Sequence, residues 1–287
     1  MATLGNPKNT IEVLQKYNFN FQKKFGQNFL INTGILEEII EAAEITKDDF
    51  VLEIGPGIGT MTQYLCESAR EVIAVEIDKN LIPILKDTLS AYDNVEVLNE
   101  DILKVDIKKL AEERNAGRPI KVVANLPYYI TTPVIMALLE KENCISSITV
   151  MIQKEVAQRM NEKPGSKAYG ALSLAVQFYA KTNYIMTVSK NCFIPKPEVD
   201  SAVIRLDIYE PDKRPVKAQD PDAMFRIIRA AFNQRRKTLV NALGNAPELS
   251  LNKETISSAL SKMGKPETIR GEALTPEEFA ILSDILK

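Results

Sequence analysis

The chain has 287 residues, of which 45% are hydrophobic and 26% charged, and its formal net charge is −2. It contains no histidine, which excludes Ser-His-Asp and Cys-His catalysis, histidine general bases and most catalytic zinc sites. No apolar run reaches the roughly 18 residues that a membrane span needs, and the N-terminus has no signal-peptide pattern. We therefore expect a cytoplasmic protein that does not bind membranes.

From residue 34 onward, helical and strand-like patterns alternate. Helical spacing marks residues 34–44, 60–68 and 81–92, and short apolar runs predict strands at residues 50–54, 72–76, 95–98, 121–124 and 147–152. This alternation predicts an α/β fold, with a Rossmann-like parallel sheet and helices on both of its faces. Ligands bind outside the carboxyl ends of such strands. We therefore expect the polar residues at these ends to meet at one rim.

The pattern changes near residue 210. Residues 210–215, EPDKRP, are typical of a linker, and the segments 223–232, 236–243, 253–263 and 276–286 have helical spacing. The sequence therefore predicts two domains, a catalytic domain over residues 1–209 and a small all-helical domain over residues 210–287.

A glycine-rich turn follows the first predicted strand and opens a helix. Its sequence, EIGPGIG, contains Glu53, Gly55 and Gly57, and Glu76 ends the next strand, where a carboxylate can accept both hydroxyls of a ribose. A carboxylate beside the turn opposes a pyrophosphate but suits a cationic sulfonium, so S-adenosylmethionine is favoured over NAD. A turn used only for packing is the remaining alternative. Asp101, after the third strand, is either an acceptor for the adenine amine of the cofactor or a solvated loop acid.

The fourth strand leads into a candidate catalytic segment, Asn125, Leu126, Pro127 and Tyr128. The Asn125 side-chain oxygen and the Leu126 carbonyl can accept hydrogen bonds from an exocyclic adenine amine, which localises its lone pair for attack on a methyl group. Tyr128 offers a face for stacking a base. In isolation this segment would favour a simple turn and a core aromatic; at a rim that holds a cofactor turn, the catalytic interpretation is favoured.

Two further features are compatible with a nucleic acid. Phe193, before a proline-containing loop, is either a second stacking face opposite Tyr128 or part of the core. Basic residues concentrate between residues 213 and 237, which is either a binding surface for phosphates or an ordinary solvated face. The three cysteines, Cys66, Cys144 and Cys192, match no zinc spacing, so no metal site is predicted.

Four segments together resemble the ribosomal RNA adenine dimethyltransferase family. They are KFGQNFL at residues 24–30, the glycine-rich turn at 53–59, NLPYYITTP at 125–133 and the loop at 193–201. The resemblance covers the chain from about residue 10 to its C-terminus, and these motifs in this order are highly specific. It implies a class I methyltransferase fold, and the segments 129–133 and 193–201 are most similar to members that act on the small ribosomal subunit.

The resemblance also implies a reaction and its residues. Two adjacent adenosines in a hairpin loop near the 3′ end of 16S rRNA would each receive two methyl groups within the precursor of the small subunit, and no obligate protein partner is implied. The implied cofactor-binding residues are Asn28, Leu30, Glu53, Gly55, Gly57, Glu76, Asp101 and Asn125; Asn125, Leu126, Pro127 and Tyr128 would act on the base, with Tyr128 and Phe193 stacking on it; Arg229, Arg235, Arg236 and Lys237 would contact RNA phosphates.

Three alternatives stay open at this point. An erythromycin-resistance methylase would act on large-subunit rRNA, and a non-catalytic assembly or transcription factor on the same fold would transfer no methyl group. An NAD oxidoreductase would bind a dinucleotide in competition with S-adenosylmethionine.

Overall fold

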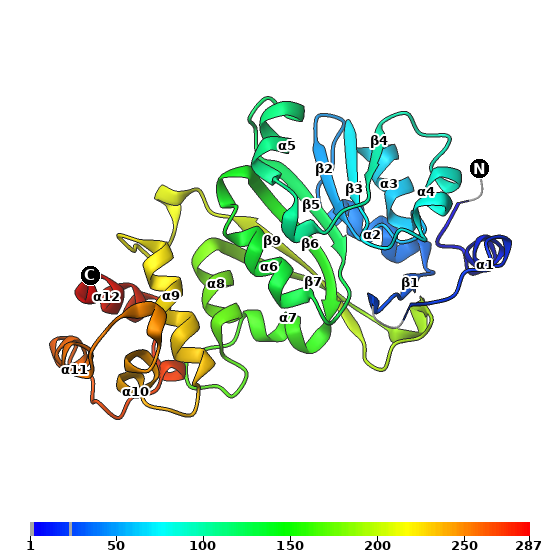
Figure 1. Cartoon of the computed structure of the whole chain (residues 1–287). Coiled ribbons are helices and arrows are strands. Elements are labelled where there is room, and N and C mark those ends of the chain that lie inside the picture. The colour runs from blue at the N-terminus through cyan, green and yellow to red at the C-terminus, as the bar shows by residue number, and fades with distance from the viewer. Residues whose placement is uncertain (1–2, 23–24) are drawn as a thin grey trace. The chain divides into compact units, whose positions relative to one another are not determined.

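The computed structural model describes residues 3–22 and 25–287. These residues form two compact units (Figure 1). The first comprises the described residues up to 157 together with 181–208, and the second comprises residues 158–180 and 209–287. The expected division into functional domains at residue 209 stays a prediction; by contacts, residues 158–180 group with the C-terminal helices.

Nine strands are present in the described chain. They are β1 (Phe29–Leu30), β2 (Phe50–Ile54), β3 (Glu71–Val75), β4 (Val95–Leu98), β5 (Ile120–Asn125), β6 (Ile145–Gln153), β7 (Ala180–Val188), β8 (Phe193–Ile194) and β9 (Ser201–Ile208). Seven of them form one sheet in the order β4-β3-β2-β5-β6-β9-β7, and β1 pairs with β8 in a separate two-stranded ladder. The β4, β3, β2, β5 and β6 strands are mutually parallel, and β9 is antiparallel to β6.

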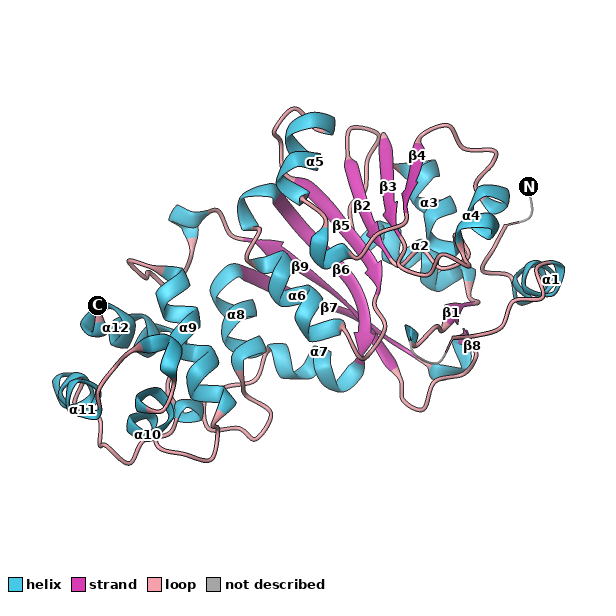
Figure 2. Ribbon diagram, viewed as in Figure 1, coloured by secondary structure: helices cyan, strands magenta, loops and turns pink. Residues whose placement is uncertain are grey.

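The first seven helices of the described chain are α1 (Pro7–Lys16), α2 (Thr33–Ala42), α3 (Thr60–Ser68), α4 (Ile82–Thr88), α5 (Ile107–Arg114), α6 (Thr131–Leu139) and α7 (Lys154–Met160). The last three residues of α7 belong to the second unit. In Figure 2, α6 crosses in front of the sheet and α2 lies behind it. Side chains alternate between the two faces of a strand, and Val51 packs into a buried cluster with Leu36 of α2 and Leu65 of α3. The predicted α/β fold with a mostly parallel sheet is confirmed.

The second unit contains α8 (Ala171–Tyr179), α9 (Pro221–Asn233), α10 (Leu239–Gly244), α11 (Lys253–Lys262) and α12 (Pro276–Leu286). Local sequence explains where two of these helices begin. Asp220 accepts from the Ala223 amide at 3.0 Å and caps α9. Thr275 and Glu278 exchange hydrogen bonds in a capping box at the start of α12.

Several predicted boundaries differ from the observed ones. The helix expected over residues 81–92 ends at Thr88. The main-chain amide of Leu89 donates to the Leu85 carbonyl and completes the last turn. The helix expected over residues 236–243 begins later, at Leu239, and ends at Gly244 as α10. No described helix has the length and apolar character required to traverse a bilayer.

Candidate active site

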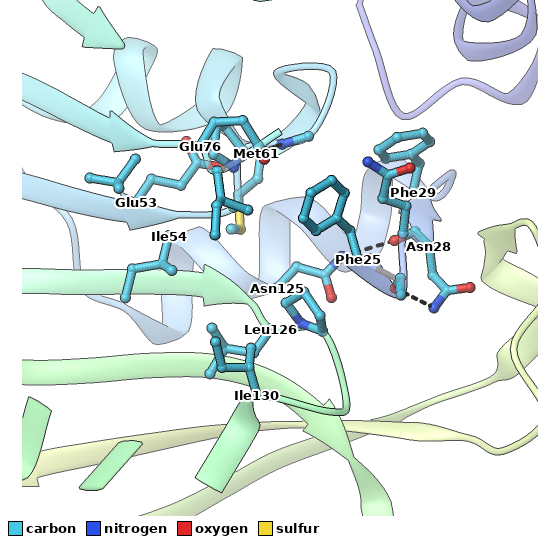
Figure 3. A pocket seen from close by; sticks show the side chains of 18 of the residues that line it. Phe25, Asn28, Phe29, Glu53, Ile54, Met61, Glu76, Asn125, Leu126 and Ile130 are labelled. Carbon is cyan, nitrogen blue, oxygen red and sulfur yellow. Dashed lines mark hydrogen bonds between the residues drawn. The ribbon is translucent and has the colours of Figure 1, made fainter. Parts of the chain in front are cut away.

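A cavity of about 1140 Å³, with open solvent at its mouth included, lies at the carboxyl ends of β2, β3 and β5 (Figure 3). The sequence-predicted residues that line it are Asn28, Leu30, Glu53, Gly55, Gly57, Glu76, Asp101, Asn125, Leu126, Pro127, Tyr128 and Phe193. Because parallel strands end at one edge of a sheet, the fold gathers these residues from distant positions in the chain. The structure thus brings together the residues that were predicted to bind a cofactor and a base; their individual roles stay predictions.

The glycine-rich turn forms one wall of the cavity. Gly55 and Gly57 have φ angles of +69° and +61°, in the left-handed region that favours glycine. A Cβ atom at Gly57 would lie 2.8 Å from the Phe29 ring. The turn therefore requires glycine both for its backbone conformation and for the close approach of Phe29.

Glu76, at the end of β3, is held by two main-chain amides. Its Oε2 accepts from the Gly57 amide at 3.2 Å, and its Oε1 accepts from the Asp78 amide at 2.8 Å. Burial raises the pKa of this carboxyl to about 7, although the two amides oppose the shift. The carboxyl is thereby fixed in orientation at the cavity wall.

Glu53 is the second buried carboxyl of the cavity. Its exposed fraction is 0%, and neither carboxyl oxygen has a hydrogen-bond partner among the described residues. Burial, with a further contribution from the charge of Glu76, raises its pKa to about 8. A buried carboxyl with no donor is unusual and requires an explanation.

The loop after β4 supplies an acid and an apolar surface. Asp101 accepts from the Leu103 amide at 3.0 Å, which caps the short 3₁₀ turn Ile102–Lys104. Ile77 and Ile102 line the cavity near the two acids Glu76 and Asp101, and Ile77 is 47% exposed. Neither isoleucine was predicted from the sequence, although each directly follows a predicted site acid. Apolar side chains beside hydrogen-bonding acids suit a purine nucleoside.

Asn125 ends β5, and its side chain is held by the N-terminal segment. Its Nδ2 donates to the Asn28 main-chain carbonyl at 3.1 Å (Figure 3). Its Oδ1 accepts no hydrogen bond from the described residues. The amide nitrogen is thus committed to the protein, and the amide oxygen is left as an acceptor.

The turn after Asn125 is also fixed. The Leu126 amide donates to the Met151 carbonyl on β6 at 3.1 Å, and the Pro127 carbonyl accepts from the Thr131 hydroxyl at 3.1 Å. These contacts set the direction of the main chain at the cavity wall.

The N-terminal motif KFGQNFL closes another side of the cavity. Gln27 donates to the Asp78 carboxylate at 2.7 Å, and Leu30 pairs with Phe193 across the β1–β8 ladder. Lys24, the first residue of this motif, lies outside the described residues. The motif thus joins three parts of the site: the segment after Glu76, the amide of Asn125, and the loop at 193–201.

The aromatic residues differ in accessibility. The Tyr128 hydroxyl lies 2.9 Å from the Ser201 hydroxyl, and its ring is partly exposed. Phe193 lines the cavity but is only 3% exposed and packs in the apolar cluster with Leu30. Tyr129, which was not among the predicted site residues, also lines the cavity and is 56% exposed.

The basic residues predicted to contact RNA lie in the second unit. Arg229 is exposed on α9, and Arg236 and Lys237 are exposed in the turn that follows it. Arg235 instead forms a salt bridge with Glu272 at 2.7 Å and donates to the Ser166 carbonyl at 3.2 Å. Its guanidinium therefore has a structural role within the unit.

Residues 18–268 match the family model described as ribosomal RNA adenine dimethylase. The chain is 66% identical to "Ribosomal RNA small subunit methyltransferase A" of Lachnoclostridium phytofermentans over 100% of this chain and 98% of that protein. It is 51% identical to the protein of the same name from Clostridioides difficile, again over 100% of this chain and 98% of that protein.

Two solved structures are similar throughout most of the chain. A dimethyladenosine transferase from Plasmodium falciparum is 27% identical with a TM-score of 0.68, covering 88% of this chain and 95% of that one. The 23S rRNA methyltransferase ErmE is 25% identical with a TM-score of 0.62, covering 90% of this chain and 99% of that one.

Proposed function

The chain belongs to the ribosomal RNA adenine dimethylase family, and we propose that it methylates the N6 amines of two adjacent adenosines in a hairpin loop near the 3′ end of 16S rRNA. The product is a pair of N6,N6-dimethyladenosines. The methyl donor of this family is S-adenosylmethionine. The proposed substrate is the rRNA within a precursor of the small ribosomal subunit, and the proposed location is the cytoplasm.

The cavity fits this donor. Its described lining contains the acids Glu53, Glu76 and Asp101 and no lysine or arginine. Such a lining suits a cationic nucleoside and opposes the two negative charges of a pyrophosphate, which argues against NAD. Asp101 would accept from the adenine amine, Glu76 would accept from the ribose hydroxyls, and Asn28, Leu30, Gly55 and Gly57 would enclose the cofactor. When bound, the cofactor supplies an electrophilic methyl group.

The observation that carries the proposal is the held amide of Asn125. An adenine amine is a poor nucleophile because its lone pair is delocalised into the ring. The Asn125 Oδ1 and the Leu126 carbonyl would accept its two N–H bonds and favour a pyramidal nitrogen. Tyr128 and Phe193 would hold the base, which must leave its stack to enter the cavity.

No general base is required for this step. The attacking nitrogen becomes cationic when it takes the methyl group, and its proton is then readily lost to water. This is compatible with a chain that contains no histidine.

The small-subunit substrate is favoured over the large-subunit one by relative similarity. Relatives named for the small subunit are 66% and 51% identical, whereas the 23S rRNA methyltransferase ErmE is 25% identical.

To test the proposed function, under-methylated small subunits are incubated with the protein and labelled S-adenosylmethionine. The modified nucleoside is then identified by mass spectrometry and mapped by primer extension. Label confined to large-subunit rRNA would favour the erythromycin-resistance type, and no label at saturating cofactor would favour a non-catalytic factor.

A further inference from the structure

Glu53 is a fully buried acid that lines the cofactor cavity, and its carboxyl oxygens make no hydrogen bond to the described residues. It lies on β2 one residue before the last position of the strand and shares a face with Val51. That face is covered by α3. An ionised carboxylate in this position would lack a counter-charge, and its oxygens make no hydrogen bond to the described residues, so burial disfavours the ionised form.

No described neighbour relieves this cost with a positive charge. From β3 the ionisable group that faces Glu53 is the carboxyl of Glu76, and from α3 the facing groups are the Thr62 hydroxyl and the Cys66 thiol. No lysine or arginine belongs to the described cavity lining. The pKa of Glu53 is accordingly raised to about 8 by burial, so the empty cavity favours the neutral acid near pH 7.

The strand order indicates which part of the cofactor reaches Glu53. Along the rim, Asp101 follows β4, Glu76 follows β3, Glu53 is the penultimate residue of β2 and Asn125 ends β5. This step rests on the proposed function: with adenine at Asp101 and ribose at Glu76, the next part of the molecule in that direction is its amino-acid end. That end carries an ammonium group, which offers N–H donors as well as charge, whereas a sulfonium offers charge alone.

We propose that Glu53 carries a proton in the empty cavity and releases it to solvent when the ammonium group of the cofactor binds beside it. The O–H bond of the carboxyl breaks, the proton passes to buffer, and the carboxylate accepts an N–H of the ammonium group. No other reactant is needed.

The proposal predicts the direction in which cofactor affinity changes with pH. Binding releases a proton, so cofactor affinity rises with pH while Glu53 is protonated in the free enzyme, by up to about tenfold per pH unit for one proton. The dependence fades once the pH exceeds the pKa of the free site. Glu76 is also shifted upward and adds a smaller release when a ribose binds.

Isothermal titration calorimetry of the full chain without RNA tests the proposal. Titrations in phosphate and in imidazole at pH 6 to 7, two buffers with different ionisation enthalpies, give the number of protons released, and this range lies below the usual titration of a free α-amino group. The probes are S-adenosylhomocysteine and 5′-methylthioadenosine, which are both neutral thioethers that share a nucleoside; only the first has the amino-acid end. The variants are Glu53→Gln, which is nearly isosteric and uncharged, and Glu38→Gln, an exposed control on α2.

We expect S-adenosylhomocysteine to release about one proton more than methylthioadenosine near pH 7, and S-adenosylmethionine to release the same number as S-adenosylhomocysteine. The difference should disappear in Glu53→Gln and persist in Glu38→Gln. Equal release by the two thioethers in the unaltered protein would overturn the proposal and needs no variant. Release by S-adenosylmethionine but not by its demethylated product would assign the effect to the sulfonium and would also overturn it. Because no RNA is present, these results are independent of whether the labelled-methyl assay supports the proposed substrate.

Discussion

The side-chain amide of Asn125 donates to the main-chain carbonyl of Asn28, 97 residues earlier in the chain, at 3.1 Å. This bond defines which end of the amide is a donor and which end remains an acceptor. It also makes the N-terminal motif a support for the proposed catalytic residue.

Replacing Asn125 with alanine is expected to lower the methylation rate constant by about 10²- to 10³-fold, the range found when one preorganised transition-state hydrogen-bonding group is removed. Cofactor affinity should change little, because Glu76 and Asp101 remain. Single-turnover methyl transfer and calorimetric binding of S-adenosylhomocysteine measure the two effects separately. Unchanged single-turnover rates would remove Asn125 from the mechanism.

The Glu76→Ala substitution is expected to weaken cofactor binding by about tenfold or more, since it also leaves the Gly57 and Asp78 amides without their acceptor. Calorimetric titration with S-adenosylhomocysteine measures the loss. Glu67→Ala, on α3 and outside the cavity lining, is the control for nonspecific effects. If Glu76→Ala bound as tightly as the control, the assignment of Glu76 to the ribose would be wrong.

Glu53 should also make the stability of the empty protein depend on pH. Its pKa is about 8 in the folded state, above the ordinary value of 4.5, so the folded protein binds the extra proton. Stability from this group is therefore fully present below about pH 4.5 and is lost as the pH rises through 8, by up to about 1.4 kcal/mol per pH unit.

Glu53→Gln should remove this dependence. Urea unfolding without ligand at pH 5 and pH 8 should show that the variant gains stability relative to the parent as the pH increases. A constant difference between the two proteins at both pH values would show that Glu53 does not titrate with folding.

The basic residues after α9 should separate into two groups. Reversing the charges of Arg236 and Lys237 is expected to weaken RNA binding and to flatten the slope of log affinity against log salt by about 2, one for each lost phosphate contact. Arg235→Ala should act mainly on stability, by about 1 kcal/mol or less, because its salt bridge to Glu272 is partly exposed. Filter binding across salt concentrations and urea unfolding measure the two quantities. A salt slope that Arg236 and Lys237 do not alter would exclude them from the RNA contact.

Local sequence pattern predicted the limits of four elements correctly. The observed β2, α3, β4 and α12 have the expected limits. The helix α8 was not predicted, because nearly all of its side chains are buried and it lacks the one-sided polar pattern that marks an amphipathic helix. The strand β7 was also missed, since its burial does not alternate regularly.

The candidate site also contains features that the sequence could predict and features that it could not. Glu53, Glu76, Asp101 and Asn125 were predictable because each stands at or near a strand end, and parallel topology brings such ends together. The bond from Gln27 to Asp78 was not predictable. It depends on the conformations of two loops far apart in sequence, and no local pattern determines such a pairing.

The β1–β8 ladder has a consequence for synthesis of the chain. Leu30 lies opposite Phe193, so one wall of the cavity joins an early segment to a late one. While the polypeptide is growing on a ribosome, the N-terminal segment has no partner strand until residues 193 and 194 have left the exit tunnel. A nascent chain that already contains the glycine turn and Asn125 therefore still lacks a closed cofactor cavity, and the enzyme becomes competent only after more than two thirds of it has been translated.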